Sequence, residues 1–132
     1  MSKVAPFLGR WVLDPSRSRY EHGPIPRAAT YTIDGDDTQL RFTIDWTPAQ
    51  GETLHVTQAL WFPVPTKVDD AEVTMRLIDG RTLETLVRED GREVARATRV
   101  VSEDGRELEV TQSGEMGDDE RFENVSVYVR AE

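Results

Sequence analysis

The chain has no cysteine and only two histidines among its 132 residues. Without cysteine it can form neither a disulfide nor a thiolate metal site. His22 and His55 lie far apart in the sequence, so one chain offers no histidine-rich zinc or copper site. Either histidine could in principle hold a haem iron, as one histidine does in some barrel proteins. We therefore expect no metal site and no cofactor.

Long apolar runs and helical periodicity are also missing. No run approaches the roughly 20 apolar residues that cross a bilayer as a helix, and the N-terminus shows no signal-peptide pattern. The sequence also lacks a Gly-x-Ser-x-Gly nucleophile elbow, a glycine-rich phosphate loop and a dinucleotide fingerprint. We expect a cytoplasmic protein without these catalytic motifs.

Basic residues are few relative to acidic ones. The chain has 16 Lys and Arg against 25 Asp and Glu, which gives a net charge of −9. Four of the acids crowd near one turn, namely Glu115, Asp118, Asp119 and Glu120. Phosphate backbones and anionic membranes repel such a surface. We expect the acids to form a solvated face, and we expect neither nucleic acid nor a membrane as a partner.

Alternation of apolar and polar residues is the strongest local pattern, as in residues 39–46. A period of two is typical of an antiparallel strand with one buried face. Asp-Gly pairs at 79–80, 90–91 and 104–105 favour tight hairpins between such strands. The pattern predicts nine strands, near residues 8–14, 28–34, 38–46, 53–62, 71–78, 82–89, 93–101, 107–113 and 121–130.

Nine short strands joined mostly by hairpins form a meander, and closing a meander into a barrel removes its exposed edges. We predict an all-β fold, a single antiparallel up-and-down barrel of about 8–10 strands, with residues 1–132 as one domain. A two-sheet sandwich is the alternative, but the chain offers only two long connections for its crossovers, 15–27 and 63–70. Asp14-Pro15-Ser16 predicts one capped helical turn, and the later prolines exclude a helical lid.

Short motifs at both ends of the chain resemble a known superfamily. Leu8-Gly9-Arg10-Trp11 resembles the Gly-x-Trp signature of lipocalins and other calycins, and Val127-Tyr128-Val129-Arg130 resembles the terminal strand of fatty-acid-binding proteins. The stretch from Asp70 to Tyr128 is similar to small bacterial lipocalin-like proteins. The resemblance implies that Trp11 plugs the closed end of the barrel and that the first strand pairs with the last. It also implies a loop over the mouth, where fatty-acid-binding proteins have a helical hairpin.

The last predicted strand has two faces, and the sequence leaves open which one points into the barrel. Three valines within 125–129 share one face, which burial alone would place inside. Asn124, Ser126 and Tyr128 share the other face. The resemblance to fatty-acid-binding proteins places Tyr128 inside, with Ser126 where those proteins have a carboxylate-binding arginine. We adopt this orientation because buried polar groups concentrate at ligand sites.

Arg99 lies on a strand whose other residues are mostly small or apolar. It could point inward and bind a carboxylate through two hydrogen bonds, as an inward arginine does in similar proteins. Ala95 and Ala97 on the same face would leave room for a ligand. Alternatively, Arg99 could point outward and pair with a neighbouring glutamate, because buried unpaired arginine is rare.

Other candidate site residues come from the strand 53–62 and the loop before the second strand. The strand has large apolar groups on both faces, which predicts a central or covered strand. Its Gln58 would hydrogen-bond in a pocket, and His55 is either a general base or an ordinary exposed residue. Tyr20 and His22 could contact a ligand if their loop closes over the mouth. The remaining ligand-binding candidates are Phe42, Trp46, Trp61, Met75 and Asn124.

Two functions fit this barrel. The first is binding of a small hydrophobic or aromatic molecule in the interior by a monomer or homodimer. Its pocket would be shaped by Leu40, Phe42, Ile44, Leu60, Met75 and Leu77, with Arg99, Tyr128, Gln58 and Ser126 orienting a polar end. The second is a cofactor-independent isomerase, cyclase or lyase, in which Tyr128 or His55 moves a proton and Arg99 stabilises an oxyanion. A perturbed pKa on an inward His or Tyr beside an arginine would favour the enzyme.

Overall fold

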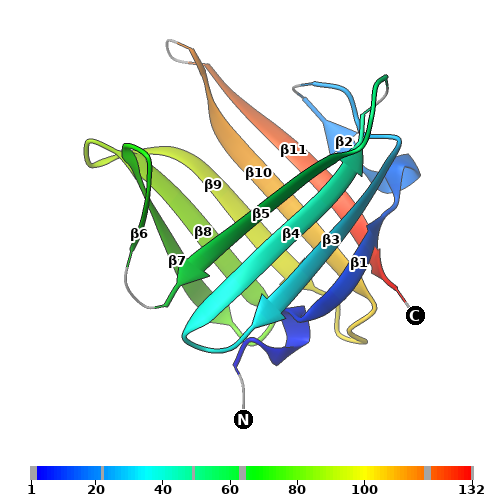
Figure 1. Ribbon diagram of the computed structural model, residues 1–132, viewed down its shortest axis with the longest axis horizontal. Coiled ribbons are helices and arrows are strands. Elements are labelled where there is room, and N and C mark those ends of the chain that lie inside the picture. Colours follow the sequence, from blue (N-terminus) through cyan, green and yellow to red (C-terminus); the bar gives the residue numbers. More distant parts are fainter. Residues whose placement is uncertain (1–2, 22, 49, 63–64, 118–119, 132) are drawn as a thin grey trace.

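Alternating side chains place nearly the whole chain in one antiparallel sheet, which curves into a nearly closed up-and-down barrel in the computed structural model (Figure 1). The structure describes residues 3–21, 23–48, 50–62, 65–117 and 120–131. Its strands are β1 (Gly9–Leu13), β2 (Arg19–Tyr20), β3 (Ala28–Gly35), β4 (Gln39–Thr47), β5 (Leu54–Trp61), β6 (Thr66–Val68), β7 (Ala71–Asp79), β8 (Thr82–Glu89), β9 (Arg92–Val101), β10 (Glu107–Gly117) and β11 (Glu120–Arg130).

The strand order shows how the barrel closes. Neighbours follow the order β5-β4-β3-β1-β11-β10-β9-β8-β7-β6, and the short β2 pairs with β11 beside this path. The first long strand is therefore hydrogen-bonded to the last, with Trp11 opposite Arg130 and Leu13 opposite Tyr128. The two ends of the order, β5 and β6, are not paired with each other in the described part of the chain, although β5 contacts β7.

The predicted barrel and all nine predicted strands are confirmed. The structure also has two short strands that the sequence did not predict. Both β2 and β6 were missed because segments of two or three residues are too short to show alternation. Within the described ranges the only helices are two 3₁₀ turns, η1 (Ala5–Phe7) and the expected η2 (Pro15–Arg17). No helix there is long and apolar enough to cross a membrane. The acidic turn at 118–119 lies outside the described residues.

The prediction that strand 53–62 is central or covered was wrong. It forms β5, the last strand at one end of the sheet order, and Leu60 is its only buried residue. Leu60 packs in the core, whereas Leu54, Val56 and Trp61 are each nearly half exposed. Large apolar groups on both faces therefore do not show that a strand is covered.

A stacked arginine closes one end of the barrel. Trp11 is fully buried, and its Nε1 donates to the carbonyl of Phe7 at 3.0 Å. The Arg130 guanidinium lies 4.1 Å from the Trp11 ring centroid. It donates to the carbonyl oxygens of Leu8, Gly105 and Pro6 at 2.7, 2.8 and 3.0 Å. The side chains buried most completely, such as Phe7 and Leu108, pack around this end.

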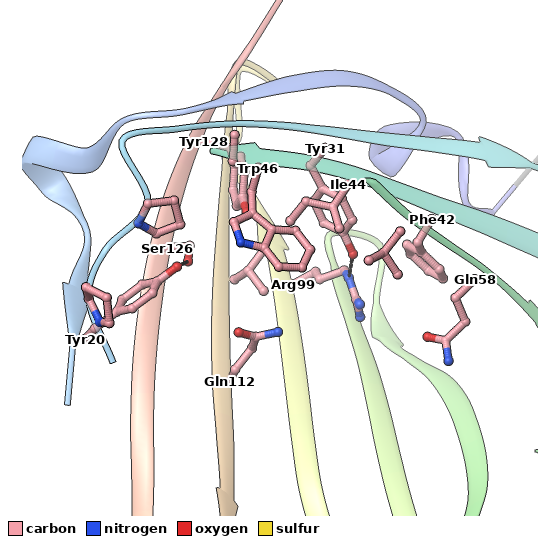
Figure 2. A pocket seen from close by; sticks show the side chains of 15 residues that line it. Tyr20, Tyr31, Phe42, Ile44, Trp46, Gln58, Arg99, Gln112, Ser126 and Tyr128 are labelled. Atoms are coloured by element: carbon pink, nitrogen blue, oxygen red, sulfur yellow. Dashed lines mark hydrogen bonds between the residues drawn. The ribbon is translucent and has the colours of Figure 1, made fainter. Parts of the chain in front are cut away.

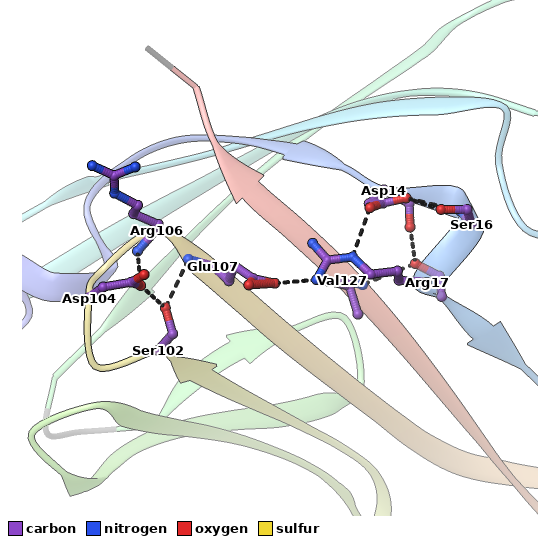
Figure 3. Close-up of polar contacts among 9 residues, drawn as sticks. Asp14, Ser16, Arg17, Ser102, Asp104, Arg106, Glu107 and Val127 are labelled. Atoms are coloured by element: carbon purple, nitrogen blue, oxygen red, sulfur yellow. Dashed lines mark hydrogen bonds and ion pairs between the residues drawn. The ribbon is translucent and has the colours of Figure 1, made fainter.

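A polar network on the outer surface connects η2 to β10 (Figure 3). Asp14 caps the turn and accepts from the Ser16 backbone N–H at 3.1 Å and from the Ser16 hydroxyl at 2.6 Å. Arg17 Nε lies 2.8 Å from Asp14, and its Nη1 lies 2.6 Å from Glu107. Hydrogen bonds from Ser16 and then Arg17 hold the pKa of Asp14 below its usual value. The network fixes the direction in which the chain leaves β1 for the barrel mouth.

Replacing Arg130 with methionine tests the closed end. Methionine keeps an apolar stem over Trp11 but removes the cation and all three hydrogen bonds. We expect the free energy of unfolding to fall by roughly 2–4 kcal/mol, because three carbonyl oxygens lose charged donors. Urea unfolding followed by tryptophan fluorescence measures this change. Arg10→Met, at an exposed position of β1, is the matched control and should stay within about 0.5 kcal/mol of wild type. Equal losses in the two variants would contradict this account.

Candidate functional site

A cavity of about 430 Å³ occupies the half of the barrel opposite the Trp11 plug (Figure 2). Small-molecule pockets range from roughly 300 to 1,000 Å³, so one small ligand fits. All three tyrosines of the chain line this cavity. Arg99 is the only charged residue among its described lining residues.

Alternation along the strands explains the composition of the wall. Residues at every second position point inward. The strand positions that line the cavity are Ala29 and Tyr31 of β3, Phe42, Ile44 and Trp46 of β4, Val56 and Gln58 of β5, Arg99 of β9, Val110 and Gln112 of β10, and Ser126 and Tyr128 of β11. The segment between β1 and β3 adds Tyr20, Pro24 and Pro26, and so forms part of the wall near the mouth.

Arg99 points into the barrel and is 7% exposed. Its Nε donates to the Tyr31 hydroxyl at 2.8 Å, and its Nη1 donates to the Thr85 hydroxyl at 2.7 Å. The guanidinium lies 4.5 Å from the Phe42 ring centroid. The alternative in which Arg99 points outward toward a glutamate is therefore wrong. Two hydroxyls and a ring face therefore replace water around part of this cation.

One side of the Arg99 guanidinium stays open to the cavity. A guanidinium has five N–H donors, and the bonds to Tyr31 and Thr85 use one on Nε and one on Nη1. In the described part of the chain, Arg99 forms no ion pair and its Nη2 has no hydrogen bond. Every fully buried side-chain nitrogen or oxygen among these residues has a hydrogen-bond partner. Because Nη2 has none, it is not fully buried. Nη2 is therefore accessible from the cavity.

The polar face of β11 points inward, as the adopted orientation required. Tyr128 is 5% exposed, and its ring centroid lies 5.5 Å from that of Tyr31. The Ser126 hydroxyl lies 2.7 Å from the Tyr20 hydroxyl. Burial raises the pKa of Tyr128 well above its ordinary value, so this phenol stays protonated at neutral pH. On the opposite face Val129 is 39% exposed, so the valine-inward alternative is wrong.

The structure brings most of the candidate residues together. Eight of them line the cavity, namely Arg99, Tyr128, Gln58, Ser126, Phe42, Ile44, Trp46 and Tyr20. Asn124 is buried but lies outside the cavity wall, and its Oδ1 accepts the backbone N–H of Glu21. Leu40 and Leu60 belong to the packed core. Met75 and Leu77 border a separate hollow with Phe62.

His55 and Trp61 point away from the cavity, because they alternate with Val56 and Gln58 along β5. The His55 side chain is 65% exposed, and its Nδ1 lies 2.5 Å from Asp45 Oδ1 on the neighbouring strand. Its proposed role as a base in the cavity is therefore wrong for this structure. His22 lies outside the described residues. Among those described, no three His, Cys, Asp or Glu residues form a metal-binding group.

Sequence reasoning missed Tyr31, Thr85 and Gln112. Each stands at an inward position of an alternating strand, next to residues such as Ile33 or Leu83 that are fully buried. Alternation alone could have placed them inside. The hydrogen bond between Tyr31 and Arg99 joins residues 68 positions apart, so the local sequence carries no signal for that pairing.

Comparison with known proteins supports the fold. No protein-family model matches this chain, and no curated protein does. A solved structure of a Schistosoma mansoni fatty-acid-binding protein in complex with arachidonic acid is similar, with a TM-score of 0.60. The match covers 98% of this chain and 99% of that protein at 15% sequence identity. This likeness shows the fold alone, an antiparallel up-and-down barrel of the predicted kind.

Removing the Tyr128 hydroxyl tests its burial. Unfolded tyrosine has a pKa of about 10, and burial raises the pKa in the folded state. The folded protein therefore holds the phenol proton more tightly than the unfolded chain does. The contribution of this proton to the free energy of unfolding is present below pH ~10 and is lost as the pH rises above it. We expect the free energy of unfolding of the wild type to fall more steeply than that of Tyr128→Phe between about pH 10 and 12. Parallel urea-unfolding curves for the two proteins would contradict this.

Proposed function

We propose that the barrel binds a small hydrophobic or aromatic molecule that carries an anionic group, and that Arg99 binds this group. The observation that supports the proposal is the Arg99 guanidinium. It is buried, faces the cavity and forms no ion pair among the described residues. We also infer that residues 1–132 act as one ligand-binding domain.

Electrostatics explains why an anion would bind here. Arginine stays protonated in proteins, and a buried charge without a counterion is destabilising by several kcal/mol. Tyr31, Thr85 and Phe42 offset part of this cost. A carboxylate at Nη2 would supply the missing opposite charge, and charge-assisted hydrogen bonds of this kind are the strong ones.

The rest of the wall favours an apolar ligand body. Ile44, Val56, Val110 and the aromatic rings contribute carbon surface around the cavity. Contact with such surface is worth roughly 25 cal/mol per Å² of apolar area removed from water. The similar Schistosoma mansoni protein was solved with arachidonic acid, which supports the use of the interior for a molecule with an apolar body and one acidic end.

Proton-transfer chemistry has less support than binding. Tyr128 does lie near Arg99 with a perturbed pKa, but the shift is upward and makes the phenol a weaker acid. A proton shuttle works best with a pKa near the working pH. With His55 on the outer face, the described cavity wall contains no histidine, aspartate or glutamate. Tyr128 is better suited to donating a hydrogen bond to a bound anion.

Fluorescence titration with 8-anilinonaphthalene-1-sulfonate, an aromatic anion, tests the proposal. We expect saturable binding by the wild type and a Kd at least about tenfold higher for Arg99→Gln, because a desolvated charge pair is lost. Arg41→Gln is the matched control, since it removes the same charge from an exposed position of β4. Its Kd should equal that of the wild type. Absence of saturable binding, or equal effects of the two variants, would refute the proposal.

A further inference from the structure

The cavity wall is unusually rich in rings for this chain. Five of its ten aromatic residues line this one cavity, namely Tyr20, Tyr31, Phe42, Trp46 and Tyr128. Tyr31 stacks on Phe42 with centroids 6.1 Å apart and contacts Tyr128 at 5.5 Å. Ring faces attract the edges and faces of other rings beyond simple area burial. Flat walls of this kind suit a planar ring system better than a flexible alkyl chain.

The carboxylate subsite has more than one donor. Arg99 Nη2 is accessible from the cavity, as shown above. The Tyr31 hydroxyl accepts from Arg99 Nε at 2.8 Å, so its own proton remains available to a ligand. The two groups come from β9 and β3, which are far apart in the sheet order, and they meet across the barrel interior through this hydrogen bond. One carboxylate can therefore accept from both.

A second polar subsite lies away from the first. The Tyr20 and Ser126 hydroxyls are 2.7 Å apart and both line the cavity. Figure 2 shows this pair on one side of the Trp46 ring and Arg99 on the other. A hydroxyl pair keeps one donor and further acceptor positions after bonding to itself. An alkyl chain laid against it would remove these groups from water without replacing their hydrogen bonds.

The charge of the cavity wall favours a neutral ligand group at the Tyr20–Ser126 pair. Arg99 is the only charged side chain among the described lining residues. A second carboxylate at the Tyr20–Ser126 pair would lie in the cavity without a counterion, which is unfavourable. A hydroxyl there can both donate and accept. The two subsites together match a monoanion with one neutral polar end.

We propose, on the basis of the function proposed above, that the preferred ligands are hydroxylated aromatic monocarboxylates. The carboxylate binds Arg99 Nη2 and the Tyr31 hydroxyl, the rings lie against Trp46 and Phe42, and the distal hydroxyl binds the Tyr20–Ser126 pair.

Calorimetric titration of the full chain with four probes tests this inference. The probes are 6-hydroxy-2-naphthoate, 2-naphthoate, 2-naphthol and decanoate. We expect 6-hydroxy-2-naphthoate to bind most tightly and 2-naphthoate about 3- to 10-fold more weakly, because it lacks one hydrogen bond. 2-Naphthol, which lacks the carboxylate, should bind at least about tenfold more weakly than 6-hydroxy-2-naphthoate. Decanoate should bind at least about tenfold more weakly than 2-naphthoate.

Paired variants locate the hydroxyl subsite. The double variant Tyr20→Phe with Ser126→Ala should make the two naphthoates bind with equal affinity, because the hydroxyls that bind the distal hydroxyl are lost. Thr43→Val, which removes an exposed hydroxyl from β4, is the control and should keep the preference. If the double variant retains the preference for the hydroxylated probe, the placement of the hydroxyl is refuted.

The outcomes separate this inference from the proposed function. Decanoate binding as tightly as 2-naphthoate, with both weakened by Arg99→Gln, would overturn the aromatic preference and leave the anion-binding proposal intact. If no probe and no anilinonaphthalene sulfonate binds in an Arg99-dependent manner, both proposals fail. Both proposals are supported by the following set of results. The wild type binds 6-hydroxy-2-naphthoate more tightly than the other three probes, the double variant loses the preference over 2-naphthoate, and Arg99→Gln weakens the binding of both naphthoates.

Discussion

The stack of Arg130 on Trp11 determines how the sheet closes. Its three hydrogen bonds tie β11 to the segment before β1 and to the turn before β10. Gly9 has a φ of +127°, and a Cβ there would lie 2.6 Å from Arg130 Nη1, so glycine is required beside the arginine. With β1 held against β11 in this register, alternation sets which side chains of these two strands point inward.

Two arginines, on β11 and on β9 with β10 between them, illustrate how the partners of a side chain decide its role. Arg130 donates to three carbonyl oxygens and covers a tryptophan, so its donors are used within the fold. Arg99 donates to two hydroxyls and covers a phenylalanine, which leaves donors facing a cavity. One arginine therefore completes the core at its end of the barrel, and the other leaves unused donors in the cavity. An incomplete site of this kind is what a ligand can complete.

The sequence was sufficient for the barrel and insufficient for the orientation of its polar residues. Alternation and Asp-Gly turns located β7, β8 and β9 closely, because these signals are local, whereas β10 continues beyond its predicted end at residue 113 to Gly117. On β11, burial alone would have turned the valines inward, and only the resemblance of Tyr128 and its neighbours to fatty-acid-binding proteins favoured the observed face. Arg99 could not be oriented, because its partner Tyr31 comes from β3, which the local sequence does not place beside β9. Thr85 lies on β8, which the predicted hairpin at 90–91 does place there, but this alone does not show which face of β9 points inward.

The acidic surface and the single internal cation act on different length scales. A net charge of −9 repels anions in solution, but salt screens exposed charges beyond about 8–10 Å. Inside the cavity the lower effective dielectric strengthens the attraction of Arg99 for an anion that has lost its water. Under the proposed function, a monoanion with an apolar body would lose little at the surface and gain at Arg99, whereas a dianion would bring a second charge for which the described cavity wall has no partner. The proposal therefore ties the charge of the ligand to Arg99 and its shape to the rings of the wall.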